Sequence, residues 1–211
     1  NLKYEIKDGT VTITGCDKKA SGALTIPATI EGKPVTSIGK SAFSRCYSLT
    51  SIRIPDSVTS IGKEAFSACT SLTSITVPDG VTSIGKYAFS NCSDLTSITI
   101  PDGVTSIGER AFSSCLRLLA IKVGAGNISY ADVDGVLFNK KKTLLVTYPK
   151  GKKGTNYDVP DGVATIGVAA FYQCRNLRNI TISDGATAIG EEAFHGCSSL
   201  MSITIPDSVT S

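Results

Sequence analysis

Tryptophan is absent from this 211-residue chain, and histidine and methionine each occur only once. A hydrolytic triad around the single histidine, His195, would need a GxSxG motif or a partner cysteine, and the sequence shows neither. No CxxC pair is available to hold a metal ion. These absences predict a protein that is not an enzyme, with no catalytic residue, no cofactor and no metal site. His195 is expected to be an ordinary surface residue.

Long apolar runs are also missing, because none approaches the roughly 20 residues that a membrane-spanning helix needs. The first residues, NLKYEIKDGT, do not resemble a signal peptide and do not begin with Met. We therefore expect no direct membrane insertion, and a chain that is a mature form or a piece of a longer protein.

The net charge of the chain is small, but it is unevenly placed. The chain has 21 Lys and Arg against 18 Asp and Glu, a formal charge of +3. Residues 124–159 hold six Lys and three Asp, so the remaining 15 basic and 15 acidic residues cancel. A nucleic-acid-binding domain usually carries a broader basic face. The charge pattern therefore predicts no nucleic-acid partner and marks residues 124–159 as unusual.

The strongest pattern in the sequence is a motif that returns at every twenty-third position. The spacing of 23 holds for the first four and again for the last two members of two series: the phenylalanines Phe43, Phe66, Phe89, Phe112, Phe171 and Phe194, and the cysteines Cys46, Cys69, Cys92, Cys115, Cys174 and Cys197. A fixed period of roughly 20 to 50 residues is typical of solenoids, in which each unit buries its apolar face against its neighbours. The six phenylalanines are expected to form one internal stack.

Each unit, as in residues 72–92, can be divided into three parts. LTSITV alternates β-branched and polar residues and predicts a strand. PDG predicts a turn, and VTSIG is short and extended, which leaves a second strand open as an alternative. KYAFSNC predicts one or two turns of helix. The expected fold is an α/β solenoid: a right-handed superhelix with one parallel β-sheet and short helices on the opposite side. Eight strands are expected, centred on Ile26, Ile54, Val77, Ile100, Val123, Val159, Ile182 and Ile205.

The ends and one internal segment depart from the repeat. Residues 1–23 alternate around Asp8-Gly9, which predicts a β-hairpin cap, and residues 24–211 form the solenoid. The interval from Val123 to Val159 is one period plus thirteen residues, so residues 124–153 contain an insertion, in which GVLF and TLLVTY flank NKKK as a second β-hairpin. The last residues, SITIPDSVTS, stop where IGxxAF is due, so we expect the natural chain to continue.

The repeats, as in LTSITIPDGVTSIGERAFSSC at residues 95–115, resemble the BspA-like leucine-rich repeat family. The resemblance covers about residues 24–211. It implies a leucine-rich solenoid at the surface of, or secreted by, a host-associated microbe, with a role in adhesion and host-protein binding. It does not imply a particular ligand.

The cysteines are expected to be free thiols. In stacked coils, neighbouring cysteines would run parallel about 4.8 Å apart, whereas a disulfide needs Cβ atoms about 3.8 Å apart and converging. The ladder is therefore expected to act as small buried hydrophobic groups. Cys16 lies outside the ladder and has no assigned role.

Two surfaces are candidates for ligand binding. The sheet face is rich in Ser and Thr, and its cations are Arg53 and Lys122. The insertion combines aromatic rings with lysines, which suits anionic glycans or acidic protein patches. Its candidate residues are Tyr130, Phe138, Lys140, Lys141, Lys142, Tyr148, Lys150, Lys152 and Lys153. A structural interpretation, which we favour, is that Phe138 and nearby leucines plug the coil while lysines keep a hairpin edge soluble.

Within the insertion, Asp132, Asp134 and Gly135 resemble the start of a calcium-binding loop. The bidentate Glu that completes such a loop is missing, so a turn is the favoured interpretation.

These observations favour a non-catalytic scaffold, outside the cell or on its surface, that binds host extracellular proteins or anionic glycans as a monomer. Two alternatives remain open. The chain could be the targeting arm of a larger cell-wall or secreted enzyme, or an intracellular scaffold for protein interactions, which free thiols would suit.

Overall fold

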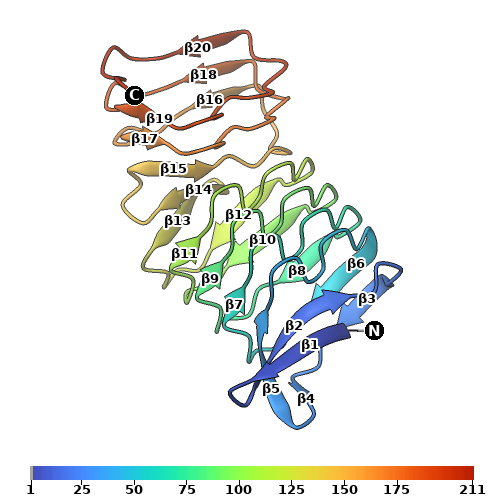
Figure 1. The fold of residues 1–211 in the computed structure, drawn as a ribbon. Helices are drawn as coiled ribbons and strands as arrows, with labels where there is room; N and C mark the ends of the chain where they lie inside the picture. Colours follow the sequence, from blue (N-terminus) through green and yellow to red (C-terminus); the bar gives the residue numbers. More distant parts are fainter. Residues whose placement is uncertain (1) are drawn as a thin grey trace.

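The structure, a computed structural model, describes residues 2–211. The chain winds into an elongated stack of coils, with its two ends at opposite ends of the stack (Figure 1). Each regular coil advances by 23 residues, as the hydrogen bond from Ser60 Oγ to Ser37 Oγ in the preceding coil illustrates. No helix long and apolar enough to cross a membrane occurs within residues 2–211.

The LTSIT segments form the first row of parallel strands, one strand for each of the eight predicted coils. The predicted centres lie at, or one residue beyond, the carboxyl ends of these strands. The strands are β3 (Ser21–Thr25), β6 (Ser48–Arg53), β8 (Ser74–Thr76), β10 (Ser97–Ile100), β12 (Ala120–Val123), β16 (Asn156–Asp158), β18 (Asn179–Thr181) and β20 (Ser202–Thr204). They pair as β3-β6-β8, β10-β12 and β16-β18-β20.

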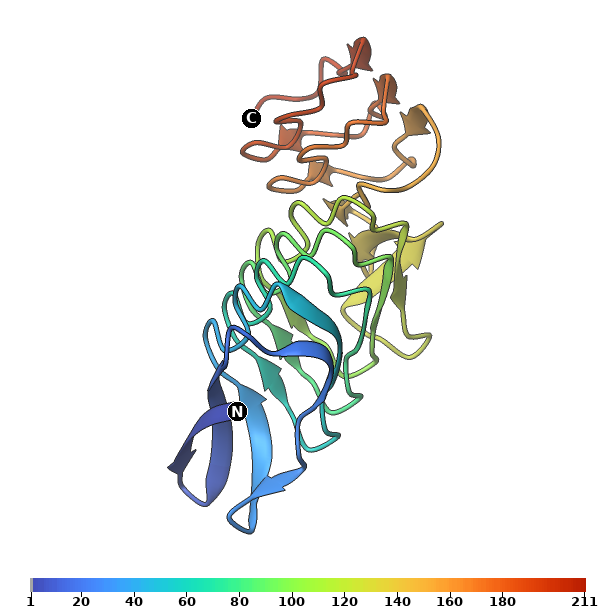
Figure 2. The same cartoon turned by 90° about the vertical axis from the view of Figure 1, so that its right-hand side faces the viewer.

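A second row of parallel strands accompanies the first, where a single sheet was predicted. Most of its strands are only two residues long and consist of the Ser-Ile pair of VTSIG or the equivalent pair in later coils. Its members are β5 (Lys33–Ile38), β7 (Ser60–Ile61), β9 (Ser83–Ile84), β11 (Ser106–Ile107), β17 (Thr165–Ile166) and β19 (Ala188–Ile189). The two rows enclose the core from two sides (Figure 2).

The predicted short helices are wrong, since residues 2–211 contain turns at these places and no helix. Two residues in each arm, such as Tyr87 and Asn91, have φ near +59°, which lies outside the α-helical region. Their N–H groups donate to the next coil, to Glu109 O at 3.1 Å and Ser113 O at 2.8 Å. In an α-helix these donors would bond within the segment. Because the stacked coils place carbonyl acceptors of the next coil beside these N–H groups, the arm forms a series of turns and no helix.

Five of the six phenylalanines are buried as predicted and Phe194 is half-buried, and the rings form two stacks instead of one. Phe43, Phe66, Phe89 and Phe112 stack with ring centroids 5.3, 5.3 and 5.7 Å apart. The second stack consists of Tyr148, Phe171 and Phe194, with centroids 5.3 and 5.2 Å apart. The core divides at the same place, into one cluster of buried residues before the insertion and another after it.

All seven cysteines are free, which confirms the thiol prediction. Ladder thiols donate to the carbonyl oxygen of the aromatic residue in the preceding coil, as Cys69 Sγ does to Phe43 O at 3.1 Å. Burial is the main reason why the pKa of Cys69 rises to about 12 and that of Cys115 to about 11. These thiols are protonated, hydrogen-bonded parts of the core.

The amino-terminal hairpin consists of β1 (Leu2–Lys7) and β2 (Thr10–Cys16), which pair antiparallel around Asp8-Gly9. β2 pairs in parallel with β5, so the hairpin extends the second row. A small strand, β4 (Thr29–Ile30), pairs antiparallel with the start of β5.

The insertion forms three strands where one hairpin was predicted. β14 (Val136–Asn139) and β15 (Leu144–Thr147) are the predicted hairpin around the lysines, and β13 (Tyr130–Val133) adds a third antiparallel strand beside β14. β15 then pairs in parallel with β17. The insertion therefore ends by rejoining the second row.

Candidate functional site

The two aromatic candidates Phe138 and Tyr148 are core residues, at 0% and 2% exposure. Tyr148 stacks on Phe171 and takes the place of the repeat phenylalanine in its coil. Cys174 Sγ donates to Tyr148 O at 3.9 Å, as the other ladder thiols do to phenylalanine carbonyls. Burial raises the pKa of Tyr148 to about 12. Neither ring is accessible to a ligand from outside, which agrees with the structural interpretation of this segment.

The hairpin strand β14 seals both parts of the core. Leu137 belongs to the cluster before the insertion, whereas Val136 and Phe138 belong to the cluster after it. Neighbouring residues of a strand point to opposite faces, so one short strand closes two apolar surfaces at once. The segment that breaks the repeat thus serves as an internal cap between two stacks of coils.

Tyr130, the third aromatic candidate, caps the exposed edge of β11. The hydroxyl of Tyr130 accepts a hydrogen bond from Ile107 N at 2.9 Å. The matching amide of a later coil, Ile189 N, donates instead to a backbone carbonyl, Ser211 O, at 2.8 Å. The side chain of Tyr130 therefore provides the hydrogen-bond acceptor that the backbone of the next coil provides for Ile189. Its pKa is raised by burial.

The edge of β12 is capped by β13 and the turn that follows it. Val123 N donates to Asp132 Oδ1 at 2.8 Å, and Ile121 N donates to Gly135 O at 2.8 Å. Asp132, which opens the motif that resembles a calcium loop, is thus engaged with the backbone. Within residues 2–211 no three His, Cys, Asp or Glu side chains gather where they could hold a metal ion.

Asn127, which begins an Asn-x-Ser sequence, ties the start of the insertion to the preceding coil. It is fully buried, and its Nδ2 donates to Pro101 O at 2.8 Å and Val104 O at 3.0 Å. Its Oδ1 accepts from Ser129 N and Tyr130 N. Asn127 lies 23 residues after Val104, at a position that is Val or Ala in the other coils. That substitution within the repeat is the signal that could have revealed it.

The lysines of the insertion differ in their surroundings. Lys150 is buried, and Lys152 donates to Asp134 O at 2.6 Å, which fastens it to the β13–β14 turn. Lys153 is exposed. The remaining three, Lys140, Lys141 and Lys142, are exposed together on the turn between β14 and β15.

The turn that carries Lys140, Lys141 and Lys142 is held by its own hydrogen bonds. Asn139 Oδ1 accepts from Thr143 N at 2.8 Å and from Leu144 N at 3.0 Å, and Asn139 Nδ2 donates to Thr143 Oγ1 at 2.9 Å. Within residues 2–211, none of the ion pairs includes these lysines. The turn thus presents three adjacent cations on a fixed backbone. We call Lys140–Lys142 the lysine turn.

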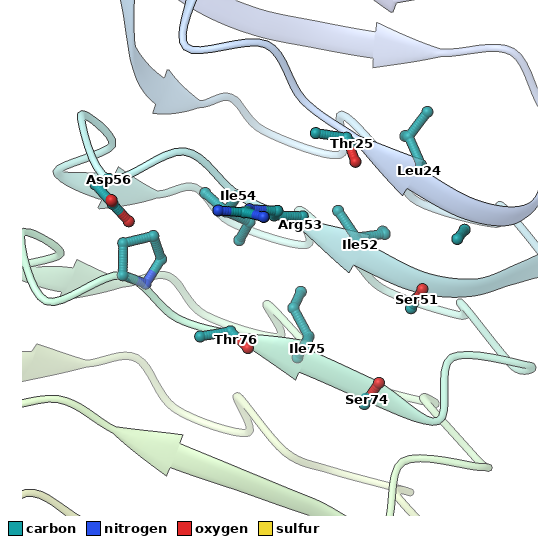
Figure 3. Close-up of a pocket in the computed structure, with 12 residues that line it drawn as sticks. Leu24, Thr25, Ser51, Ile52, Arg53, Ile54, Asp56, Ser74, Ile75 and Thr76 are labelled. Atoms are coloured by element: carbon teal, nitrogen blue, oxygen red, sulfur yellow. The ribbon is translucent and has the colours of Figure 1, made fainter.

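The remaining cationic candidates, Arg53 and Lys122, lie on the first row of strands, away from the lysine turn along the chain. Arg53 points outward from β6 above a shallow depression of about 430 Å³, beside Thr25 and Thr76 of the neighbouring strands (Figure 3). Lys122 is exposed on β12, three coils further on. The depression is lined mainly by small hydroxyl and aliphatic side chains, without an aromatic anchor. The structure therefore does not gather the predicted site residues into one cluster.

His195 is exposed, and its ring stacks on Tyr172 with centroids 5.2 Å apart. Within the described part of the chain, it belongs to no cluster of side chains that could hold a metal ion. Its position agrees with the prediction of a surface residue.

Comparison with known proteins supports the repeat assignment. The family model described as BspA type leucine-rich repeat region matches residues 23–144 and 148–211 in six copies. No curated protein matches the chain.

Several solved structures are similar over nearly the whole chain. The pneumococcal vaccine antigen PcpA is 25% identical, covers 99% of this chain and 69% of its own, and has a TM-score of 0.67. A leucine-rich repeat protein from Eubacterium ventriosum is 27% identical with a TM-score of 0.66, over 96% of this chain and 69% of its own. A leucine-rich cell surface protein from Faecalibacterium prausnitzii is 28% identical with a TM-score of 0.56, over 99% and 76%.

Proposed function

This chain belongs to the BspA-type leucine-rich repeat family, and on that basis we propose that it is a non-catalytic binding scaffold for adhesion to host proteins or glycans. The scaffold is secreted or displayed at the cell surface and works as a monomer. Two similar proteins support this location, since one is described as a vaccine antigen and another as a cell surface protein.

The observation that carries the proposal is the lysine turn. It concentrates positive charge on a chain that is otherwise balanced, and its charges are not neutralised by ion pairs within residues 2–211. The Asn139 hydrogen bonds fix the backbone, so less conformational entropy is lost when a partner binds. Adjacent exposed cations on a fixed backbone suit sulfate or carboxylate groups of a glycan, or an acidic patch of a protein.

The test replaces the three lysines with serine and measures binding to immobilised heparin, used as an anionic glycan. Three exposed charges at about 0.5 kcal/mol each predict a loss of about tenfold in affinity at low ionic strength. The loss should shrink in high salt, because screening weakens the contribution of the lysines in the parent protein.

A matched control changes Lys3, Lys7 and Lys19 to serine, which removes the same charge from exposed positions near the amino-terminal hairpin. We expect this control to bind heparin almost as tightly as the parent does. Equal losses in both variants would show that total charge alone matters. Unchanged binding in the lysine-turn variant would leave the insertion with its structural role only.

A further inference from the structure

The coil that contains the insertion is two residues too short in one arm. The strands pair Leu145 with Ile166, twenty-one positions apart, whereas Tyr148 stacks on Phe171 at the usual spacing of twenty-three. Only Val146 and Thr147 connect Leu145 to Tyr148, where regular coils have four residues, such as Gly62 to Ala65. The backbone that normally projects between neighbouring arms is therefore missing at this coil.

In regular coils, the missing segment makes three backbone hydrogen bonds. Gly62 N donates to Ile38 O at 2.8 Å, Lys63 O accepts from Ser41 N at 2.9 Å, and Glu64 N donates to Lys86 O at 2.9 Å. The next coil repeats this pattern at residues 85–87, with distances of 2.8, 2.9 and 3.1 Å. A Gly-X-X segment thus joins the coil before it to the coil after it.

At the shortened coil, the three groups that such a segment would engage remain in place. They are Ile107 O and Arg110 N on the preceding coil, and Val168 O on the following one. Among the backbone and side-chain hydrogen bonds of residues 2–211, none involves these three groups. Unpaired backbone groups are costly when they are shielded from water, so a ligand that pairs them gains affinity.

These three residues line a cavity of about 310 Å³ between the two stacks of coils. Its floor is apolar and includes Tyr130, Leu144 and Val146. Leu144 and Val146 face the cavity, whereas Leu145 between them is fully buried in the core.

Contacts across the junction hold the walls of the cavity in place. Arg110 forms an ion pair with Glu192 at 3.0 Å, and Ser114 Oγ donates to Gln173 Oε1 at 3.1 Å. Both contacts link the coil before the insertion to coils after it. The cavity is therefore kept open by the fold itself, and does not depend on a mobile loop.

The geometry points to a peptide-binding site at this junction: the cavity receives a Gly-X-X segment of a partner protein. The first N–H of the segment donates to Ile107 O, the carbonyl of its second residue accepts from Arg110 N, and the third N–H donates to Val168 O. The apolar floor contacts the side chains that flank the segment. This site goes beyond the proposed function, because it does not involve the lysine turn and recognises uncharged backbone.

Glycine is required at the first position for a steric reason. In regular coils a Cβ at Gly62 would lie 2.8 Å from Gly39 C, and one at Gly85 would lie 2.5 Å from Gly62 C. The bound segment occupies the equivalent position against Ile107 and Gly108. A methyl group at that position would meet the backbone of the preceding coil and prevent the first hydrogen bond.

The test uses the whole chain and a capped peptide, Ser-Ile-Gly-Lys-Glu-Ala-Phe, which reproduces residues 60–66 of a regular coil. Titration is followed by the amide NMR signals of the ¹⁵N-labelled protein. The signals of Arg110 and its neighbours should shift in a saturable manner. The matched peptide with Gly replaced by Ala should bind at least about tenfold more weakly, the size of a lost hydrogen bond plus a steric contact.

A Val146→Trp variant fills the cavity from its floor and should abolish the shifts while retaining the parent's thermal unfolding profile. A Lys140→Ser variant should bind the peptide as the parent does, which separates this site from the lysine turn. Equal binding of the Gly and Ala peptides, shifts that survive in a folded Val146→Trp variant, or the absence of any shift at millimolar peptide would each overturn the proposal.

Discussion

The four regular coils before the insertion and the coil that contains it satisfy their backbone hydrogen bonds in different ways. In the regular coils, many backbone amides donate to a carbonyl in the neighbouring coil, and each phenylalanine stacks on the next. At the insertion, side chains replace the missing neighbour: Tyr130 serves Ile107, and Asp132 serves Val123. In a repeat protein, each coil is stabilised mainly by its contacts with the coils on either side. Where the repeat is interrupted, other residues must therefore provide the missing hydrogen bonds.

The largest expected effect separates the middle of a stack from its end. Phe89→Ala removes a fully buried ring stacked on both sides and should cost about 3–5 kcal/mol of unfolding free energy. Phe194→Ala should cost less, because Phe194 is only half-buried and stacks on one ring. Urea unfolding of both variants checks this, and equal losses would contradict nearest-neighbour stacking.

A second prediction concerns the thiol ladder that runs through both regions. Burial raises the pKa of Cys115 to about 11 and that of Cys69 to about 12, from 9.0 for an ordinary thiol. Below pH 9 both the folded and the unfolded chain keep these protons. Between pH 9 and the folded values only the unfolded chain loses them, so stability falls as pH rises, by up to about 1.4 kcal/mol per pH unit for each thiol.

Unfolding free energies measured from pH 8 to pH 11 check this fall. A Cys69→Ala, Cys115→Ala variant should show a shallower decline than the parent, since two of the titrating groups are gone. The same slope in both proteins would mean that other groups govern the alkaline loss.

Much of the fold could be predicted because the same structural motif recurs six times in the sequence. The period located the coils, and the spacing between cysteines excluded disulfides. The helices were predicted wrongly because AFxxC spacing fits one helical face, while the choice of hydrogen-bond partner is decided by the adjacent coil. That choice depends on stacking, which the sequence of one unit does not show.

The functional surfaces were harder to predict for a related reason. Tyr148 follows the register of the repeat and could have been assigned to the core, as could Tyr130, which lies 23 residues after Ile107. Comparison of each insertion residue with the repeat position it replaces would have separated these core and cap residues from the lysine turn. The cavity could not be predicted from the sequence. It forms because the segment between Leu145 and Tyr148 is two residues shorter than in a regular coil, while the coils on either side keep their positions.

The smallest expected effect on stability, and the most direct test of the internal cap, comes from removing one oxygen. Tyr130→Phe keeps the ring and should cost about 1 kcal/mol, since it leaves Ile107 N without an acceptor. Hydrogen exchange at single amides is the decisive measurement. We expect Ile107 N–H to exchange much faster in Tyr130→Phe than in the parent, while Ile84 N–H in the regular stack is unchanged. Unaltered protection of Ile107 would contradict the claim that side chains of the insertion replace a missing coil.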